Sequence, residues 1–279
     1  MAKKIGYLGP AGTFTEEAAL LYDSKAQLIP FPSIPAVATA VVSGMVEEGV
    51  VAIENSIEGS VTDTLDVLIQ ESNLAIWREI VLPIRQCLVV KPGTTAEAIK
   101  VIYSHPQALA QCRRFLERCF PKAQMEAALS TAAGVEEAKK GDGSVAAIAT
   151  KRAAQLYEVE VLAHGIQDTS SNLTRFVVLS SKDHPATGYD RTSLCFSFDD
   201  DRPGLLVGVL GEFARRNINM AKIESRPSKE SLGQYIFLLD LDGHRDDPPV
   251  KEALEKVRDT TSRLKVIGSY PRYRAPDSG

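Results

Sequence analysis

Short apolar runs alternate with longer amphipathic segments from Ile5 to Leu179. A continuous apolar run is typical of a strand buried on both faces, whereas apolar residues three or four positions apart predict a helix. This alternation predicts an α/β architecture with a largely parallel sheet. The predicted strands are Ile5–Leu8, Val50–Ile53, Leu74–Ile80, Arg85–Val90, Val101–Tyr103, Met125–Leu129, Val145–Ala149, Val159–Ala163 and the strand that follows Thr174.

Residues that cap helices precede several of the amphipathic segments. Thr13 with Glu16 makes a capping box, so we expect a helix from there to about Tyr22. Ser104 with Gln107 makes a second box before another such segment. The remaining predicted helices are Ser33–Glu48, Val61–Glu71, Thr94–Ile99, Ala108–Cys119, Thr131–Lys140 and Lys151–Tyr157.

Three strand-to-helix turns carry small and polar residues, namely Gly9–Thr15, Glu54–Ser60 and Ser104–Gln107. In α/β sheets, ligands bind beyond the carboxyl ends of the strands, where helix N-termini offer free N–H groups and a positive dipole end. The turns therefore favour an anionic small molecule as ligand. The alternative is that each turn is only a well-capped helix start, because such caps are common.

Composition changes at Ser180–Arg191, a polar stretch with Pro and Gly that indicates an interdomain linker. The second unit predicted after it has the order βαββαβ, the ferredoxin-like plan. Such a sheet has free edges that can pair with another copy, so we expect an oligomer. The predicted elements are strands Thr192–Phe198, Ala221–Ser225, Tyr235–Leu241 and Leu264–Ser269, and helices Pro203–Arg216 and Pro249–Thr261.

Composition narrows the class of protein. With 44% hydrophobic residues, 24% charged residues and a net charge of −4, the chain is typical of a soluble globular protein without a basic nucleic-acid stripe. Scattered cysteines and the absence of a secretory signal favour the cytoplasm. No window approaches the roughly 18 apolar residues of a membrane span. The histidine spacing indicates no metal site.

The stretch Asp168–Leu179, DTSSNLTRFVVL, brings a hydroxyl, a guanidinium and an aromatic ring together where a loop becomes a strand. In a buried setting Thr174 supplies a hydrogen-bond donor, and Arg175 supplies a planar cation suited to a carboxylate. Phe176 supplies a wall that excludes water. The alternative is an ordinary strand with a solvated arginine.

Five blocks, in order along nearly the whole chain, closely resemble the prephenate dehydratase family with its C-terminal ACT domain. They are GPAGTFTEEAA at 9–19, AIENSIEGSV at 52–61, SHPQALAQC at 104–112, SSNLTRF at 170–176 and ESRP at 224–227. Five ordered blocks are far more specific than one short motif. The resemblance implies a two-lobed catalytic domain like a type II periplasmic binding protein at 1–181. A linker at 182–191 and a ferredoxin-like ACT regulatory domain at 192–271 follow.

The resemblance also implies a reaction, the conversion of prephenate to phenylpyruvate with loss of CO₂ and water in phenylalanine biosynthesis, without a cofactor or metal. The family's threonine in the T-R-F motif donates a proton to the departing ring hydroxyl, and this role carries over to Thr174. Arg175 is the candidate clamp for a substrate carboxylate. The other positions that carry over for substrate binding are Phe176, Asn55, Ser56, Ser104, Gln111 and Thr13.

The ESRP block implies feedback inhibition by L-phenylalanine bound between ACT domains, in a homodimer or homotetramer joined through ACT and catalytic domains. The family's other regulatory block usually reads G-A-L, so the leucine after Gly204 puts a larger side chain near the expected effector. The positions expected near that effector are Gly204, Leu205, Leu206, Asn219, Glu224, Ser225, Arg226 and Pro227.

Two alternative functions stay open at this point. An arogenate dehydratase would use the same site on a substrate that bears an amino acid side chain in place of the pyruvyl group. An amino-acid-responsive binding protein would keep the cleft and the sensor without catalysis. The intact T-R-F motif at 174–176 argues against the binding protein.

Overall fold

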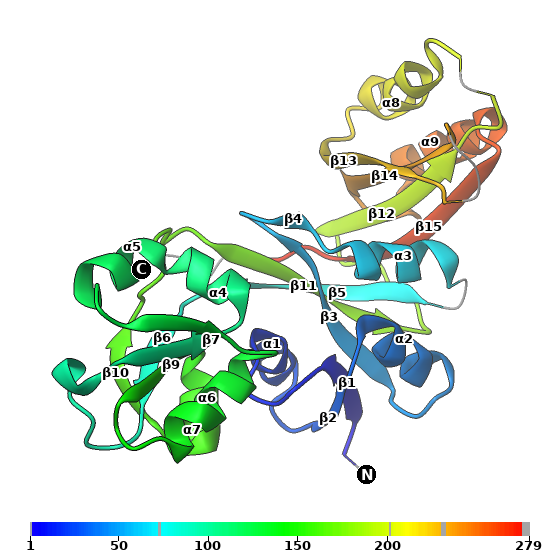
Figure 1. Cartoon of the computed structure of the whole chain (residues 1–279). Coiled ribbons are helices and arrows are strands. Elements are labelled where there is room, and N and C mark those ends of the chain that lie inside the picture. The colour runs from blue at the N-terminus through cyan, green and yellow to red at the C-terminus, as the bar shows by residue number, and fades with distance from the viewer. Residues whose placement is uncertain (1, 72–73, 201, 230–232, 275–279) are drawn as a thin grey trace. The chain divides into compact units, whose positions relative to one another are not determined.

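The computed structural model describes residues 2–71, 74–200, 202–229 and 233–274. Its strands form three sheets, of order β2-β1-β3-β11-β5 with β4 on β3, β10-β6-β9-β7-β8, and β13-β14-β12-β15 (Figure 1). The fold is therefore mixed α/β, as predicted. The chain forms two compact units. The first consists of Met1–Val37, Val50–Val61 and Val81–Phe176. The second consists of Ala38–Gly49, Thr62–Ile80 and Val177–Gly279.

The first sheet contains two strands that the sequence pattern did not predict. Strand β2 carries Pro30 and lies at the end of the strand order, where a residue without an N–H group is tolerated. Strand β4 is only two residues long and pairs antiparallel with the end of β3. The strands of this sheet are β1 (Lys4–Leu8), β2 (Gln27–Phe31), β3 (Glu48–Asn55), β4 (Gly59–Ser60), β5 (Ala75–Pro83) and β11 (Leu173–Ser180).

The second sheet is mixed, so the expectation of a largely parallel arrangement is wrong there. Strand β7 pairs in parallel with β8 and β9, whereas β6 runs antiparallel to β9 and β10. Strand β6 enters this sheet directly from β5, without the helical crossover that joins the parallel strands β7, β8 and β9. The strands are β6 (Cys87–Val90), β7 (Val101–Ser104), β8 (Gln124–Ala127), β9 (Val145–Ala149) and β10 (Glu160–His164).

The helices of these two sheets follow the predicted order. Helix α2 ends at Val42 rather than at Glu48, because Gly44 takes a φ of 73° and its N–H group donates to the Val41 carbonyl at 3.0 Å. No described helix has both the length and the apolar character of a membrane span. The helices are α1 (Phe14–Tyr22), α2 (Ile34–Val42), α3 (Thr62–Gln70), α4 (Pro106–Gln111), α5 (Arg113–Cys119), α6 (Thr131–Lys140) and α7 (Lys151–Tyr157), with a 3-10 turn η1 at Ala96–Ala98.

The single helix predicted up to Cys119 is two helices, α4 and α5, that meet at Cys112. The carboxylate of Asp168 accepts hydrogen bonds from the backbone N–H of Arg114 at 3.1 Å and of Phe115 at 3.4 Å. A side chain distant in sequence thus supplies the N-terminal cap of α5, and this interrupts the helix.

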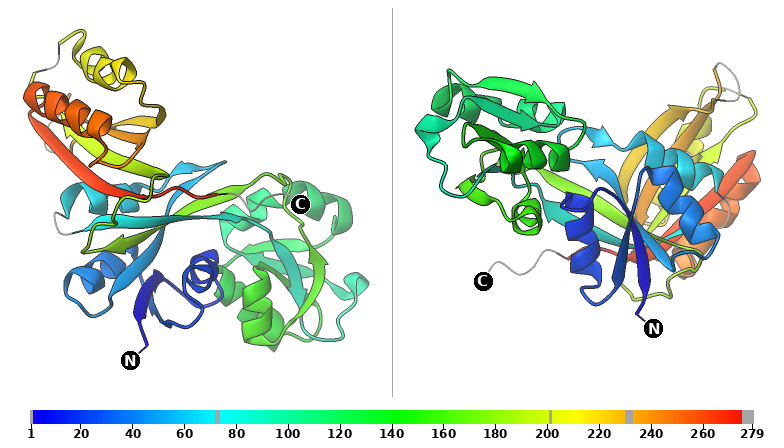
Figure 2. Two further views of the ribbon diagram at one scale, coloured as in Figure 1. Left: turned by 180° about the vertical axis from the view of Figure 1, so that it is seen from behind. Right: turned by 60° about the horizontal axis from the view of Figure 1, so that its bottom comes forward.

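The third sheet confirms the predicted order βαββαβ. Its helices α8 and α9 lie on the same face of the sheet (Figures 1 and 2). They enclose a core with Phe196 of β12, Phe213 of α8 and Val257 of α9. The elements are β12 (Asp190–Ser197), α8 (Leu205–Arg215), β13 (Met220–Pro227), β14 (Tyr235–Asp242), α9 (Pro248–Thr260) and β15 (Arg263–Pro271).

Strand β15 approaches β5 so closely at Gly268 that a side chain has no room. A Cβ atom at Gly268 would lie 2.5 Å from the backbone oxygen of Ile76 and 2.7 Å from its nitrogen. We expect Gly268→Ala to lower the free energy of unfolding by about 1–3 kcal/mol, measured by urea denaturation. The matched control is Gly208→Ala on α8, where nothing lies within 4 Å of the new Cβ and alanine favours the helix. Equal stability of the two variants would contradict this packing.

Candidate active site

The hydroxyl of Thr174 is held by an amide from a neighbouring strand. Asn55, the last residue of β3, donates a hydrogen bond from Nδ2 to Thr174 Oγ1 at 2.7 Å. The Thr174 side chain is buried, with 7% of its surface exposed. Within the described residues the hydroxyl accepts this bond and donates none. Its own proton is therefore available to a ligand.

The orientation of the Asn55 amide is fixed by the turn that follows it. The backbone N–H groups of Ile57 and Glu58 donate to Asn55 Oδ1 at 2.9 Å and 3.1 Å. Backbone N–H groups only donate, so the amide oxygen must face them and the amide nitrogen must face Thr174. The β3–β4 turn thus sets the direction of the bond to the hydroxyl.

Asn172 is the next member of this network, and the sequence analysis did not single it out. Its Oδ1 accepts from Asn55 Nδ2 at 2.8 Å, and the residue is 1% exposed. Its Nδ2 is consequently turned the other way, buried and without a hydrogen-bond partner among the described residues. A buried donor left unpaired costs about 1–3 kcal/mol, so this position suits an oxygen of a ligand. The signal available in the sequence was its place two residues before Thr174, on the same side of an extended chain.

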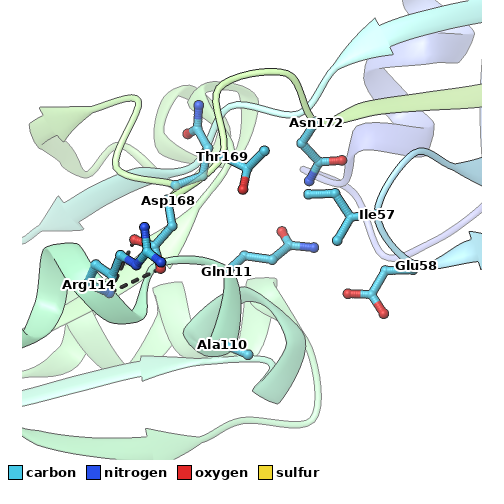
Figure 3. A pocket seen from close by; sticks show the side chains of 9 residues that line it. Ile57, Glu58, Ala110, Gln111, Arg114, Asp168, Thr169 and Asn172 are labelled. Carbon is cyan, nitrogen blue, oxygen red and sulfur yellow. Dashed lines mark hydrogen bonds between the residues drawn. The ribbon is translucent and has the colours of Figure 1, made fainter.

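A pocket of about 340 Å³ lies beside the network in the first compact unit. The amide groups of Gln111 and Asn172 point into the same space (Figure 3). Arg114 adds a cation, and Asp168 faces it with a carboxylate that already caps α5. The pocket is lined by Ile57, Glu58, Ala110, Gln111, Arg114, Gln167, Asp168, Thr169 and Asn172. The described residues include no group of three or more His, Cys, Asp or Glu side chains arranged for a metal ion.

Arg175 follows Thr174 on β11, so its side chain leaves the opposite face of the strand. Its guanidinium pairs with the Glu54 carboxylate at 3.0 Å, and the arginine side chain is 11% exposed. The arginine therefore already binds a carboxylate of the protein. Its role as a clamp for a substrate carboxylate stays a prediction.

Two of the predicted serines have structural partners. Ser56 Oγ accepts from the backbone N–H of Leu173 at 3.0 Å and so joins the β3–β4 turn to β11. Ser104 is fully buried and donates to the Ile148 carbonyl at 2.9 Å. The expected N-cap role of Ser104 is wrong, because His105 Nδ1 accepts from the backbone N–H of Gln107 instead.

Of the remaining predicted substrate residues, one lines the pocket, one caps a helix and one is buried in a strand. Gln111 lines the pocket. Thr13 caps α1 as predicted, since its Oγ1 accepts from the backbone N–H of Glu16 at 3.3 Å. Phe176 is 2% exposed and belongs to the buried part of β11.

The residues expected near an effector lie on α8, β13 and the loop between them. Gly204 caps α8 with a φ of 93°, a backbone conformation that favours glycine. Asn219 donates to the Asp242 carboxylate at 3.0 Å. Glu224 and Arg226 lie on β13, at the end of its sheet's strand order. Arg226 forms an ion pair with Asp66 of α3.

Comparison with known proteins bears on both parts of the chain. Residues 5–184 match the prephenate dehydratase family, and residues 200–259 match the ACT domain. A bifunctional chorismate mutase/prephenate dehydratase of Aquifex aeolicus is 42% identical over 270 residues, which are 96% of this chain and 74% of that protein.

Solved structures agree over almost the full length. Prephenate dehydratase from Arthrobacter aurescens, in complex with L-Phe, superposes with a TM-score of 0.89 at 36% identity, covering 96% of this chain and 90% of that one. GqqA, described as a novel type of quorum quenching acylase, superposes with a TM-score of 0.87 at 29% identity, covering 97% and 98%. By sequence and by fold, the chain belongs to the prephenate dehydratase family and ends in an ACT domain.

Proposed function

We propose that this enzyme converts prephenate to phenylpyruvate with loss of CO₂ and water, and that Thr174 donates the proton that leaves in the water. The observation that carries this proposal is the hydrogen bond from Asn55 Nδ2 to Thr174 Oγ1. It uses a lone pair of the hydroxyl and leaves the proton free. The family match supports the same reaction.

For this reaction the enzyme has to orient the substrate and supply one proton to the leaving oxygen. As the bond between the ring and its carboxylate breaks, the electron pair moves into the ring, the hydroxyl departs from the opposite ring carbon, and the ring becomes aromatic. A donor that protonates the departing oxygen contributes about 10² to 10⁴ in rate. A threonine hydroxyl is a weak acid, so Thr174 acts as a positioned donor whose proton is replaced from water.

The substrate is a dianion, and the pocket offers donors to it. Asn172 Nδ2 is a buried donor without a partner in the described chain, and Gln111 lies across the pocket from it (Figure 3). Arg114 supplies positive charge on the same lining. We assign Asn172 and Gln111 to substrate oxygens, because each bond to a charged group contributes about 1.5–3 kcal/mol.

Arg175→Lys tests whether a planar guanidinium is required at this position. Lysine keeps the charge but cannot hold a carboxylate with two parallel bonds, so kcat/KM for prephenate should fall by about 10- to 100-fold. Steady-state kinetics measure it. The control is Arg113→Lys on α5, where the side chain is 77% exposed and no change is expected. If Arg175→Lys performs like the control, the carboxylate clamp lies elsewhere.

We further propose that L-phenylalanine inhibits the enzyme by binding to the ACT domain at an interface between two copies. The place of β13 at the end of its strand order supports a copy-to-copy contact, because unpaired strand edges favour pairing. A homodimer or homotetramer in the cytoplasm fits this arrangement. The domain boundaries that accompany it are residues 1–181, a linker at 182–191, and residues 192–271.

The direct test offers the purified protein prephenate and arogenate separately and follows phenylpyruvate and phenylalanine. Phenylpyruvate from prephenate is the expected result. Phenylalanine formed faster from arogenate would instead establish an arogenate dehydratase. Binding of an amino acid without turnover of either compound would indicate a binding protein. An acylase assay run in parallel should give no product.

A further inference from the structure

Helix α3 is held along its first two turns by two cations, Arg226 of β13 and Lys229, which lies two residues beyond the end of that strand. Arg226 donates from Nη2 to Asp66 Oδ1 at 2.8 Å and from Nη1 to the carbonyl of Thr62 at 3.2 Å. Lys229 donates to the other carboxylate oxygen, Asp66 Oδ2, at 2.6 Å. Both oxygens of Asp66 are therefore engaged by the segment that carries the ESRP motif.

The end of α3 is held by two cations from β15. Lys265 Nζ donates to the carbonyls of Leu68 at 2.6 Å and Glu71 at 2.7 Å, and Arg263 donates to the carbonyl of Ile69 at 3.0 Å. The carbonyls of Leu68 and Ile69 belong to the last turn of α3 and that of Glu71 directly follows it, where orphan acceptors and the negative dipole end attract cations. Burial lowers the pKa of the Lys265 ammonium group.

The two sets of contacts frame a pocket of about 150 Å³ in the second compact unit. Asp66, Arg226, Lys229 and Arg263 all line it. The pair is partly shielded from solvent, since the side chain of Arg226 is 11% exposed and that of Asp66 is 23% exposed. A charged hydrogen bond that is partly shielded fixes position better than an exposed ion pair does.

Helix α3 is joined through a short, tightly bonded segment to the residue that holds Thr174. Helix α3 begins at Thr62. The preceding residue, Val61, donates a hydrogen bond from its backbone N–H to the Ile53 carbonyl at 2.9 Å. Just before it, β4 pairs with Glu54 and Asn55 at the end of β3. Only Val61 therefore separates the end of β4 from the start of α3, and β4 closes the turn whose N–H groups orient the Asn55 amide.

We propose that α3 transmits the state of the ACT domain to Thr174, and that the contact of Arg226 with Asp66 is the coupling contact. The inference rests on the proposed function. An effector that rearranges β13 near Glu224 changes how Arg226 holds α3, and this moves the β3–β4 turn and Asn55. For L-phenylalanine to inhibit in this way it must bind one position of α3 more tightly than the other.

Asp66→Asn in the full chain tests the coupling contact, because the amide is isosteric and loses the charge that holds Arg226 and Lys229. We expect prephenate turnover without effector to stay near that of the parent, and L-phenylalanine to bind by calorimetry. Inhibition should be largely lost, so that a coupling factor typically of about 5- to 150-fold falls to near unity. The matched control is Asp63→Asn, an exposed residue on the same helix, which should be inhibited like the parent.

A second measurement does not depend on catalysis. Hydrogen–deuterium exchange of the Thr62–Gln70 amides should change when L-phenylalanine binds the parent chain, and should not change in Asp66→Asn. Two outcomes would overturn the inference without affecting the proposed function. One is that L-phenylalanine inhibits Asp66→Asn as strongly as the parent, and the other is that exchange at α3 of the parent does not change when the effector binds. Absence of L-phenylalanine binding to the parent would overturn the proposed feedback inhibition as well, and absence of phenylpyruvate formation would overturn the proposed reaction.

Discussion

Thr174→Ala is expected to lower kcat for prephenate by about 10² to 10⁴ while substrate affinity stays nearly unchanged. The hydroxyl acts on the departing oxygen, which gains negative charge only as its bond to the ring breaks. An interaction made mainly in the transition state affects kcat rather than the binding of substrate. Steady-state kinetics with prephenate give kcat, and calorimetry of prephenate on the slow Thr174→Ala variant gives the affinity for substrate.

Thr174→Ser is the matched control for this variant. Serine keeps the donor but lacks the methyl group that restricts the rotamer in a strand, so it should recover much of the rate. The two variants are expected to have similar thermal stability, because the change removes few buried atoms. A Thr174→Ala enzyme with nearly the kcat of the parent would show that another group protonates the leaving oxygen.

Asn55→Asp is expected to lower kcat by about 10² or more, although the side chain keeps its shape. One carboxylate oxygen still accepts from the N–H groups of Ile57 and Glu58, as Asn55 Oδ1 does. The other oxygen replaces the nitrogen that faces Thr174. The hydroxyl then donates its proton to this carboxylate, and the proton is turned away from the substrate.

The control for Asn55→Asp is a variant that keeps an amide donor at this position. Asn55→Gln retains an amide but displaces it by one methylene, so it should lose rate through misplacement and not through reversal of the hydrogen bond. The dependence of kcat on pH distinguishes Asn55→Asp from Asn55→Gln. Protonation of the introduced carboxyl at low pH should restore activity in Asn55→Asp alone. Flat, unimpaired turnover of Asn55→Asp would contradict the assigned direction of the bond.

Local periodicity was sufficient for most of the fold. The order βαββαβ of the last part and the alternation before it are confirmed, because burial of one face leaves a period in the sequence itself. The errors have local or tertiary causes. Strand β2 was hidden by Pro30, and α2 ends early at Gly44. The break between α4 and α5 depends on Asp168, which lies far along the chain.

The family resemblance predicted more of the candidate site than the pattern of hydrophobic and polar residues did. Thr174 and Asn55 are separated by 119 positions, and only the family motifs predict that both lie in one site. Asn172 and Arg114 were missed, because lining a pocket depends on how distant segments pack. Ser104 was expected at the substrate, and the structure shows its hydroxyl bound to a backbone carbonyl.

The central claim is that Asn55 acts through the Thr174 hydroxyl, and a double-mutant cycle tests it most directly. The kcat for prephenate would be measured for Asn55→Asp, Thr174→Ala and the double variant in parallel with the parent. If Asn55 serves to direct the Thr174 proton, the double variant should be no slower than Thr174→Ala, because the group that Asn55 orients is already gone. Losses that multiply in the double variant would show that the two residues act independently, and would contradict the account.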